Sequence, residues 1–218
     1  MKTTKTIYNF IVDKSTSMQG SEEQVITGFN MQLAKLKELA IQYPEQNYIV
    51  SVNYFDSEIQ KEISFGAIEE VKPLTMERYI PDGMTALLDA VGGAIDTIQE
   101  TYAKELVEEK LSVVFIILTD GEENYSTLYT YELVAQKIEK LEKTGAWTFT
   151  FMGADYDPKV ISERLNIRSE NVHAFEKRSF AKNMELVSDS IAGFERSKSR
   201  GQKSSGFFKS ISDMIKIN

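Results

Sequence analysis

A short apolar run that ends in a carboxylate and two hydroxyls constrains this chain more than any other stretch. Residues 7–12 are mostly apolar, which is typical of a strand buried on both faces of a sheet. Asp13 follows where this strand is expected to end, and Ser15 and Ser17 follow at every second position. Ligands bind at the carboxyl ends of strands in open α/β sheets. One carboxylate and two hydroxyls form a partial ligand set for a hard divalent cation such as Mg²⁺.

Two later stretches add oxygen atoms at comparable places. Thr85 lies at the start of a helix expected over residues 85–106, directly after the turn Pro81-Asp82-Gly83. Residues 111–119 form the most hydrophobic of the expected strands, which should therefore be central, and Asp120 follows it. We expect Asp120 and Thr85 to complete the shell of the ion, directly or through water.

Two of these loops also have a simpler interpretation when each is read alone. Ser15 or Ser17 could cap the first helix by accepting hydrogen bonds from its free N–H groups. Asp120 and Gly121 are favoured turn formers at the end of a strand. The combination of all three loops in register favours the metal site over the capping interpretation.

The three loops, in this order, resemble the metal-ion-dependent adhesion site of the von Willebrand factor A (vWA) family. The resemblance covers nearly the whole chain up to about Glu195, and it is greatest to small single-domain members from bacteria and phages. It implies a Rossmann-like fold and one Mg²⁺, for which Mn²⁺ or Ca²⁺ could substitute. It also implies that Thr85 exchanges between direct and water-mediated contact with the ion when a ligand arrives.

The remaining elements predict a doubly wound α/β domain. Strands alternate with helices, so we expect a mostly parallel sheet of about six strands, with helices on both faces. A turn at Asp56-Ser57 predicts that residues 58–65 pair back on the preceding strand as an antiparallel edge. The other expected strands are 46–56, 145–152 and 171–175, and the other expected helices are 21–43, 131–143, 158–165 and 179–194.

The charge is distributed unevenly along the chain. Residues 196–218 carry six basic residues and one acidic residue, whereas the remainder carries 19 basic and 32 acidic residues. We therefore expect a vWA domain over residues 1–195, a flexible basic linker over 196–206 and a short amphipathic segment over 207–218. An acidic domain argues against a nucleic-acid-binding face on the domain itself.

Composition narrows the remaining chemistry. The sequence has no cysteine and a single histidine, His173, which excludes thiolate sites and histidine-rich zinc sites. No apolar run is long enough to cross a bilayer and no signal peptide is visible, so a cytoplasmic location is expected. His173 is expected to be structural. The aromatic residues Trp147, Phe149 and Phe151 are expected to belong to the core.

Other acidic residues near the expected site have less specific interpretations. Turn or capping roles are favoured for most of them, a place on the exposed or loop-facing side of its helix for Asp89, and exposure to solvent for the two glutamates after Asp120. The residues concerned are Asp56, Asp82, Asp89, Glu122, Glu123, Asp155 and Asp157. Lys14 adds a positive charge that could help to attract an acidic ligand.

The sequence leaves three functions open. The favoured one is a non-enzymatic, Mg²⁺-dependent module that binds a Glu or Asp side chain of a protein partner. A metal-dependent phosphohydrolase is the first alternative, but enzymes of the haloacid dehalogenase type need a second aspartate where this chain has Ser15. The second alternative is an accessory protein whose basic tail touches a membrane or a nucleic acid.

Overall fold

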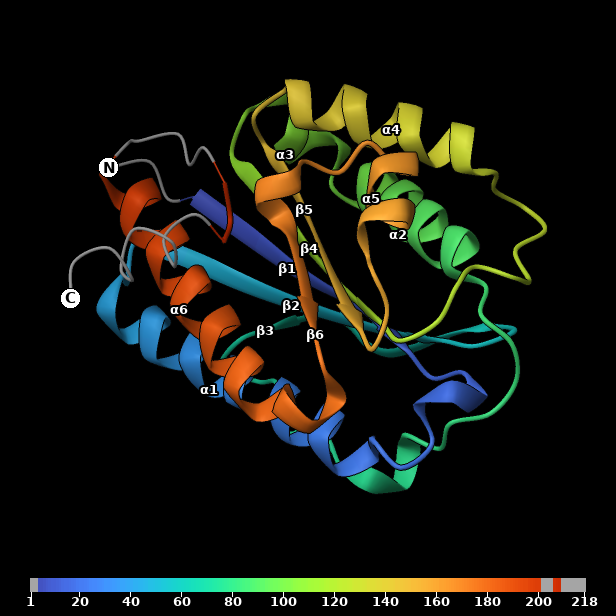
Figure 1. Cartoon of the computed structure of the whole chain (residues 1–218). Coiled ribbons are helices and arrows are strands. Elements are labelled where there is room, and N and C mark those ends of the chain that lie inside the picture. Colours follow the sequence, from blue (N-terminus) through green and yellow to red (C-terminus); the bar gives the residue numbers. More distant parts are fainter. Residues whose placement is uncertain (1–3, 201–205, 209–218) are drawn as a thin grey trace.

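The computed structural model describes residues 4–200 and 206–208, which form one six-stranded sheet between two layers of helices (Figure 1). The order of strands across the sheet is β3-β2-β1-β4-β5-β6. The strands are β1 (Thr4–Asp13), β2 (Gln46–Phe55), β3 (Ile59–Ala67), β4 (Leu111–Thr119), β5 (Trp147–Ala154) and β6 (Val172–Phe175). All neighbouring strands run parallel except β2 and β3, which form the antiparallel edge pair. The predicted fold class is confirmed.

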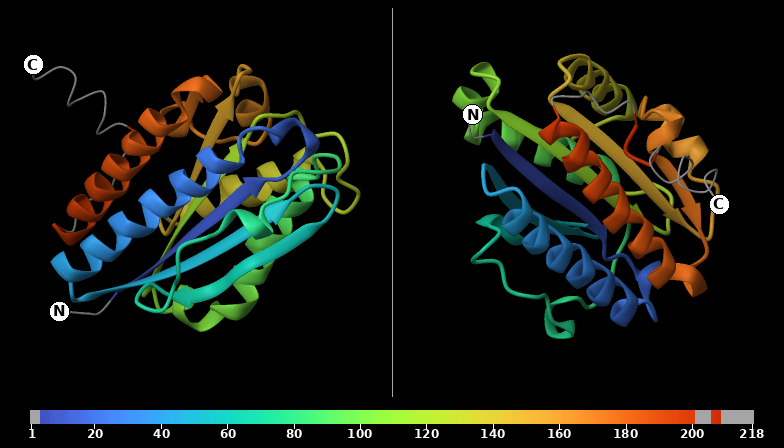
Figure 2. Two further views of the ribbon diagram at one scale, coloured as in Figure 1. Left: turned by 90° about the horizontal axis from the view of Figure 1, so that it is seen from below. Right: turned by 90° about the vertical axis from the view of Figure 1, so that its left-hand side faces the viewer.

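Helices cover both faces of the sheet. In Figure 2, α1 and α6 lie side by side on one face, and α2 and α4 lie on the other. The α-helices are α1 (Glu22–Gln42), α2 (Leu87–Thr101), α3 (Ala103–Val107), α4 (Tyr131–Lys143), α5 (Lys159–Arg164) and α6 (Phe180–Ser199). Short 3₁₀ turns are η1 (Thr16–Met18), η2 (Met76–Arg78), η3 (Ser169–Asn171) and η4 (Lys177–Ser179).

The alternation of side chains along β1 explains why this strand is central. Tyr8 and Phe10 belong to the apolar cluster under α1 and α6, whereas Ile7 and Ile11 belong to the cluster under α2 and α4. Both faces of β1 are therefore buried, and the same is true of β4. A strand that is buried on both faces has a nearly continuous apolar sequence, and residues 7–12 have such a sequence.

The observed helix α2 is shorter than the helix expected over residues 85–106. It begins at Leu87, because the backbone N–H of Thr85 donates to Asn124 and that of Ala86 donates to Asp56, 2.8 Å away. It also breaks at Tyr102, whose ring packs edge-on against Phe65 with 5.3 Å between ring centres. Tertiary hydrogen bonds therefore replace helical ones at the start of α2, whereas at Tyr102 the N–H still donates to the Ile98 carbonyl at 2.9 Å and the ring contact accompanies the break.

The last helix is longer than predicted. It continues through Ser199, so residues 196–199 belong to α6 rather than to a flexible linker. Glu195 is fully buried in it and accepts hydrogen bonds from the phenols of Tyr8 (2.7 Å) and Tyr48 (3.1 Å). These bonds attach α6 to β1 and β2, and the sequence pattern did not predict them.

Little of the expected tail is described. Phe207 and Phe208 are buried in the cluster under α1 and α6, and Phe207 N–H donates to Asn171, which holds this short segment to the domain. Most of the predicted linker and amphipathic segment, residues 201–205 and 209–218, lies outside the described residues. Within the described part of the chain, none of the helices combines the length and apolar character needed to cross a bilayer.

Candidate metal centre

Asp13 is held at the carboxyl end of β1 by neighbours on three elements. Its side chain is fully buried. One carboxylate oxygen, Oδ1, accepts the backbone N–H of Ser15 at 2.7 Å, and the other, Oδ2, accepts the hydroxyl of Thr119 at 2.5 Å. The backbone carbonyl of Asp13 accepts the phenol O–H of Tyr79 at 2.5 Å. The carboxylate is therefore fixed in orientation before any ligand arrives.

The electrostatics of Asp13 are those of a buried anion with no ion-pair partner in the part of the chain that the structure describes. Burial raises the pKa of its carboxyl group above the ordinary value. The hydrogen bonds from Thr119 and Ser15 act in the opposite direction, and the nearby Asp120 raises the pKa further. Because burial outweighs the hydrogen bonds, a cation beside Asp13 would stabilise the ionised form.

Ser15 and Ser17 turn their hydroxyls toward the same point. Their Oγ atoms lie 3.0 Å apart, and the Ser17 hydroxyl donates to Oδ1 of Asp120 at 2.6 Å. Ser15 precedes the turn η1 but makes no capping bond through its side chain. Ser21 precedes α1, also without a side-chain capping bond. The capping interpretation of the Asp13 loop therefore finds no support in the geometry.

The loop that carries Thr85 is joined to the loop after β4. Thr85 N–H donates to the side chain of Asn124 at 2.9 Å, and Asn124 N–H donates back to the Thr85 carbonyl at 3.1 Å. The oxygens then converge around Gly121. A Cβ atom at that position would lie 3.4 Å from Ser17 Oγ, 3.4 Å from Thr85 Oγ1 and 3.9 Å from Asp13 Oδ2.

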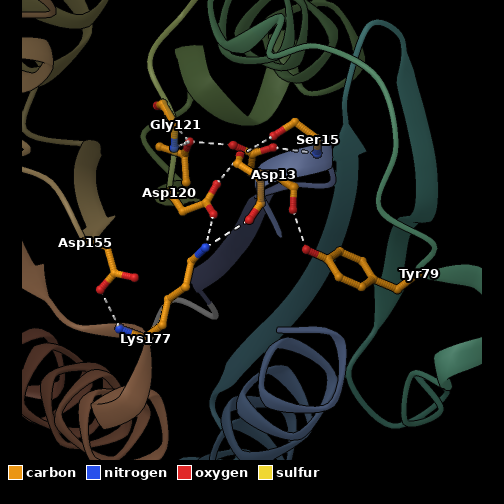
Figure 3. Close-up of polar contacts among 9 residues, drawn as sticks. Asp13, Ser15, Tyr79, Asp120, Gly121, Asp155 and Lys177 are labelled. Carbon is orange, nitrogen blue, oxygen red and sulfur yellow. Dashed lines mark hydrogen bonds and ion pairs between the residues drawn. The ribbon is translucent and has the colours of Figure 1, made fainter. Parts of the chain in front are cut away.

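Asp120 completes the group of five oxygen-bearing side chains. Only 1% of its side chain is exposed, and its Oδ2 atom is buried without a hydrogen bond of ordinary geometry. That oxygen forms an ion pair with the ammonium group of Lys177 (Figure 3). The structure thus brings together all five residues that the sequence proposed as ligands.

Several residues at this site were missed by sequence reasoning. Thr119 precedes Asp120 and could have been noticed as a hydroxyl at the end of a strand. Tyr79 lies in a connector without a periodic pattern, and Lys177 lies between an edge strand and the last helix. No local signal in the sequence links either residue to Asp13 or Asp120.

The other acidic residues mostly take the structural roles expected for them. Asp56 accepts the N–H of Glu58 within its turn, and Asp89 accepts three N–H groups of the loop 127–129. Asp82 accepts Gly83 N–H in the turn before Thr85, and Asp157 accepts the N–H of Lys159 at the start of α5.

Three other predictions concern residues around this edge of the sheet. Glu123 is not solvated as predicted, because its carboxylate accepts N–H groups from Leu88 and Ser126. Lys14 is 7% exposed and contacts Asp56 rather than facing a ligand. His173 is structural, with its Nε2 atom 2.6 Å from the Asn183 side chain.

The ligand chemistry decides which ion this arrangement fits. Among the described residues, no group of three or more His, Cys, Asp or Glu side chains is placed to hold a metal. The set formed by Asp13, Asp120 and three hydroxyls is not such a group, because only two of its five members are carboxylates. All of its ligand atoms are oxygens, and it carries two negative charges. Such a set fits a hard cation such as Mg²⁺, which retains water where a protein offers few carboxylates.

The fold and the site together define a class: a doubly wound α/β domain with an oxygen-rich site at the carboxyl edge of its central strands. Residues 9–189 match the von Willebrand factor type A domain family, and the chain belongs to that family. No curated protein matches the sequence.

Solved structures show the same fold at low sequence identity. The pilus adhesin SpaC from Lactobacillus rhamnosus GG has a TM-score of 0.64 at 12% identity, covering 88% of this chain and 30% of that one. The vWF domain of the type V pili tip protein Mfa5 from Porphyromonas gingivalis has a TM-score of 0.61 at 10% identity, and the match covers 88% of this chain and 96% of that one. The structure of proximal thread matrix protein 1 from the mussel byssus with a zinc occupied MIDAS motif has a TM-score of 0.51 at 18% identity. That match covers 87% of this chain and 46% of the mussel chain. This chain thus spans less than half of the mussel protein's length.

Proposed function

We propose that this chain is a Mg²⁺-dependent module that binds an acidic side chain of a protein partner. Asp13, Ser15, Ser17, Thr85 and Asp120 would hold the ion, and Mn²⁺ or Ca²⁺ could substitute for it. The observation that carries the proposal is the convergence of five oxygen-bearing side chains from three loops at one point.

The charge of the ligand set supports capture of a carboxylate. Two carboxylates balance the charge of a divalent ion, and the three hydroxyls add no further negative charge. A bound ion would supply a Lewis-acidic centre with a coordination position open to a Glu or Asp side chain. Thr119 and the Ser15 N–H hold the Asp13 carboxylate in place throughout, since both bonds come from the fold itself.

Family membership supports binding rather than catalysis. Domains of this family are usually non-catalytic modules that bind other proteins. The absence of an enzymatic activity, like the cytoplasmic location, stays a prediction.

Isothermal titration of Mg²⁺ and Mn²⁺ into metal-stripped protein tests the site. We expect one ion per chain in the wild type and no binding in Asp13→Ala. Glu122→Ala is the matched control, because it removes an exposed carboxylate two residues from Asp120 and should bind as the wild type does. Equal binding by Asp13→Ala and the wild type would contradict the assignment, and so would a wild type that binds no ion.

The partner is tested in a second step. A partner captured from a cell extract should be released by EDTA and should not be retained by Asp13→Ala. Replacing single Glu and Asp residues of that partner should then identify one whose loss abolishes binding. A partner that binds equally well in EDTA would show that this surface works without the ion.

A further inference from the structure

A lysine side chain reaches across the proposed metal centre. The ammonium of Lys177 forms an ion pair with Oδ2 of Asp120 and donates to the backbone carbonyl of Ser17 at 2.9 Å (Figure 3). It thus contacts two of the three loops that form the site. Its side chain is 29% exposed, whereas that of Asp120 is 1% exposed, so the lysine approaches from the solvent side.

The backbone that carries Lys177 is fixed close to the site. Lys177 N–H donates to the carboxylate of Asp155 at 2.9 Å, and the N–H of Asp155 donates to the carbonyl of Phe175 at 2.9 Å. Asp155 adopts a positive φ of 61°, a conformation that is uncommon for a residue with a side chain and is held here by these two bonds. The ammonium group is therefore a tethered cation, present near Asp120 at a high effective concentration.

No other lysine of the described residues forms an ion pair with one of the five proposed ligands. Lys14 also lies beside the Asp13 loop, but its ammonium is 2.8 Å from the side-chain oxygen of Gln60 and 3.5 Å from Asp56. Its contacts point to the β2–β3 turn and not to Asp120. Among the lysines of the described residues that form ion pairs, Lys177 is the one whose partner is a proposed ligand.

From these contacts we propose that Lys177 is the resident counter-cation of the metal-free site and sets its affinity for a divalent ion. This inference rests on the proposed function. Lys177 pairs with Oδ2 of Asp120, whereas Oδ1 of the same carboxylate lies beside the Ser17 hydroxyl, so a divalent ion bound there would lie close to the lysine ammonium, and the two positive charges would repel each other at short range. Ion binding therefore has to overcome this repulsion or move the ammonium away from Asp120, and either cost weakens binding.

The substitution Lys177→Met tests this competition. It removes the charge and keeps an unbranched side chain of similar length. Lys110→Met is the matched control, because Lys110 precedes β4 at the opposite end of the sheet and pairs with the exposed Glu108. The nine residues of β4 separate the two ends by roughly 30 Å, well beyond the Debye length of about 8 Å at physiological salt.

The full chain is titrated with MgCl₂ and MnCl₂ by calorimetry as wild type, Lys177→Met and Lys110→Met. We expect Lys177→Met to lower the Kd by about tenfold, which corresponds to about 1.4 kcal/mol. Lys110→Met should leave the Kd unchanged. An unchanged or higher Kd in Lys177→Met overturns the inference, since it would make Lys177 neutral or a support for the ligands.

Thermal unfolding gives a second measurement that does not depend on calorimetry. In EDTA, Lys177→Met should unfold at a lower temperature than the wild type, because the buried Asp120 carboxylate then lacks a counter-charge. Millimolar Mg²⁺ should raise its Tm by more than it raises that of the wild type, since ligand stabilisation grows as Kd falls. An equal shift in both proteins overturns the inference.

The outcomes separate this inference from the proposed function. If the wild type binds Mg²⁺ and Lys177→Met binds it with the same Kd, only the role of Lys177 fails. If both proteins fold and neither binds, the metal site itself fails, and the inference fails with it. Should Lys177→Met not fold, Lys177→Gln provides the same comparison with a side chain that can still donate to the Ser17 carbonyl.

Discussion

Two adjacent glycines in α2 should respond in opposite ways to the same substitution. Replacing Gly by Ala inside a helix usually stabilises it by about 1 kcal/mol, because Ala has less backbone freedom to lose on folding. At Gly93 an added Cβ would meet only the Cδ1 atom of Ile59, at 3.9 Å, which is an ordinary contact. We therefore expect Gly93→Ala to raise the free energy of unfolding by up to about 1 kcal/mol.

Gly92 faces a ring that cannot move away easily. A Cβ there would lie 2.5 Å from Cγ and 2.6 Å from Cε1 of Tyr129. The backbone N–H of Tyr129 is bonded to Asp89 at 2.8 Å, and its hydroxyl is bonded to Asp96 at 2.6 Å. Overpacking of this kind costs about 1–3 kcal/mol, which cancels or exceeds the helix gain. Gly92→Ala should therefore be less stable than Gly93→Ala by about 1–3 kcal/mol.

Urea unfolding of the two variants and the wild type, monitored by far-UV circular dichroism, measures this difference directly. Equal stability of the two variants would refute the reasoning, because it would show that Tyr129 yields without cost. The comparison bears on the site as well. Tyr129 lies in the loop between β4 and α4 that also carries Asp120 and Asn124, so Gly92→Ala should also weaken Mg²⁺ binding.

Three further substitutions test the site and its supports. Asp13→Asn should be more stable than the wild type at neutral pH in EDTA, because burial raises the pKa of Asp13 and its ionisation in the folded state therefore costs stability. Urea unfolding in a pH series measures this advantage, which should shrink as the pH falls through the raised pKa of Asp13. Gly121→Ala should weaken Mg²⁺ binding in calorimetry by about tenfold or more while stability changes little, since its methyl group would stand among the ligand oxygens. Tyr79→Phe removes the hydrogen bond to the Asp13 carbonyl and should lower the free energy of unfolding in urea by about 1 kcal/mol. Tyr54→Phe is the control and should leave that free energy unchanged, because the Tyr54 hydroxyl has no hydrogen-bond partner among the described residues.

The sequence predicted those parts of the structure that are specified locally. The runs that became β1 and β4 are buried on both faces, so their composition alone marked them as central. Asp13 and Asp120 come directly at or after the ends of these strands, and parallel neighbours bring their carboxyl ends to one edge. The proposed ligands could therefore be named without knowledge of the contacts between them.

What the sequence did not predict depends on contacts between distant residues. The start of α2 moved past Thr85 because Asn124, 39 residues later, takes its N–H. Lys177 reaches the carbonyl of Ser17 from 160 residues away, through a segment that has no helical or strand periodicity. A pattern read in short windows contains no information on such pairs.

The contacts of Asp13 and Asp120 make metal affinity a difference between competing interactions. Asp13 has no counter-charge within residues 4–200 and 206–208, which favours a cation, whereas Asp120 already has Lys177 and the Ser17 hydroxyl. An incoming ion would meet no competing cation of the described residues at the first carboxylate, and it would meet the Lys177 ammonium at the second. It follows that changes at Asp13 should act mainly through the loss of a ligand. Changes at Lys177 should alter affinity while leaving every proposed ligand in place.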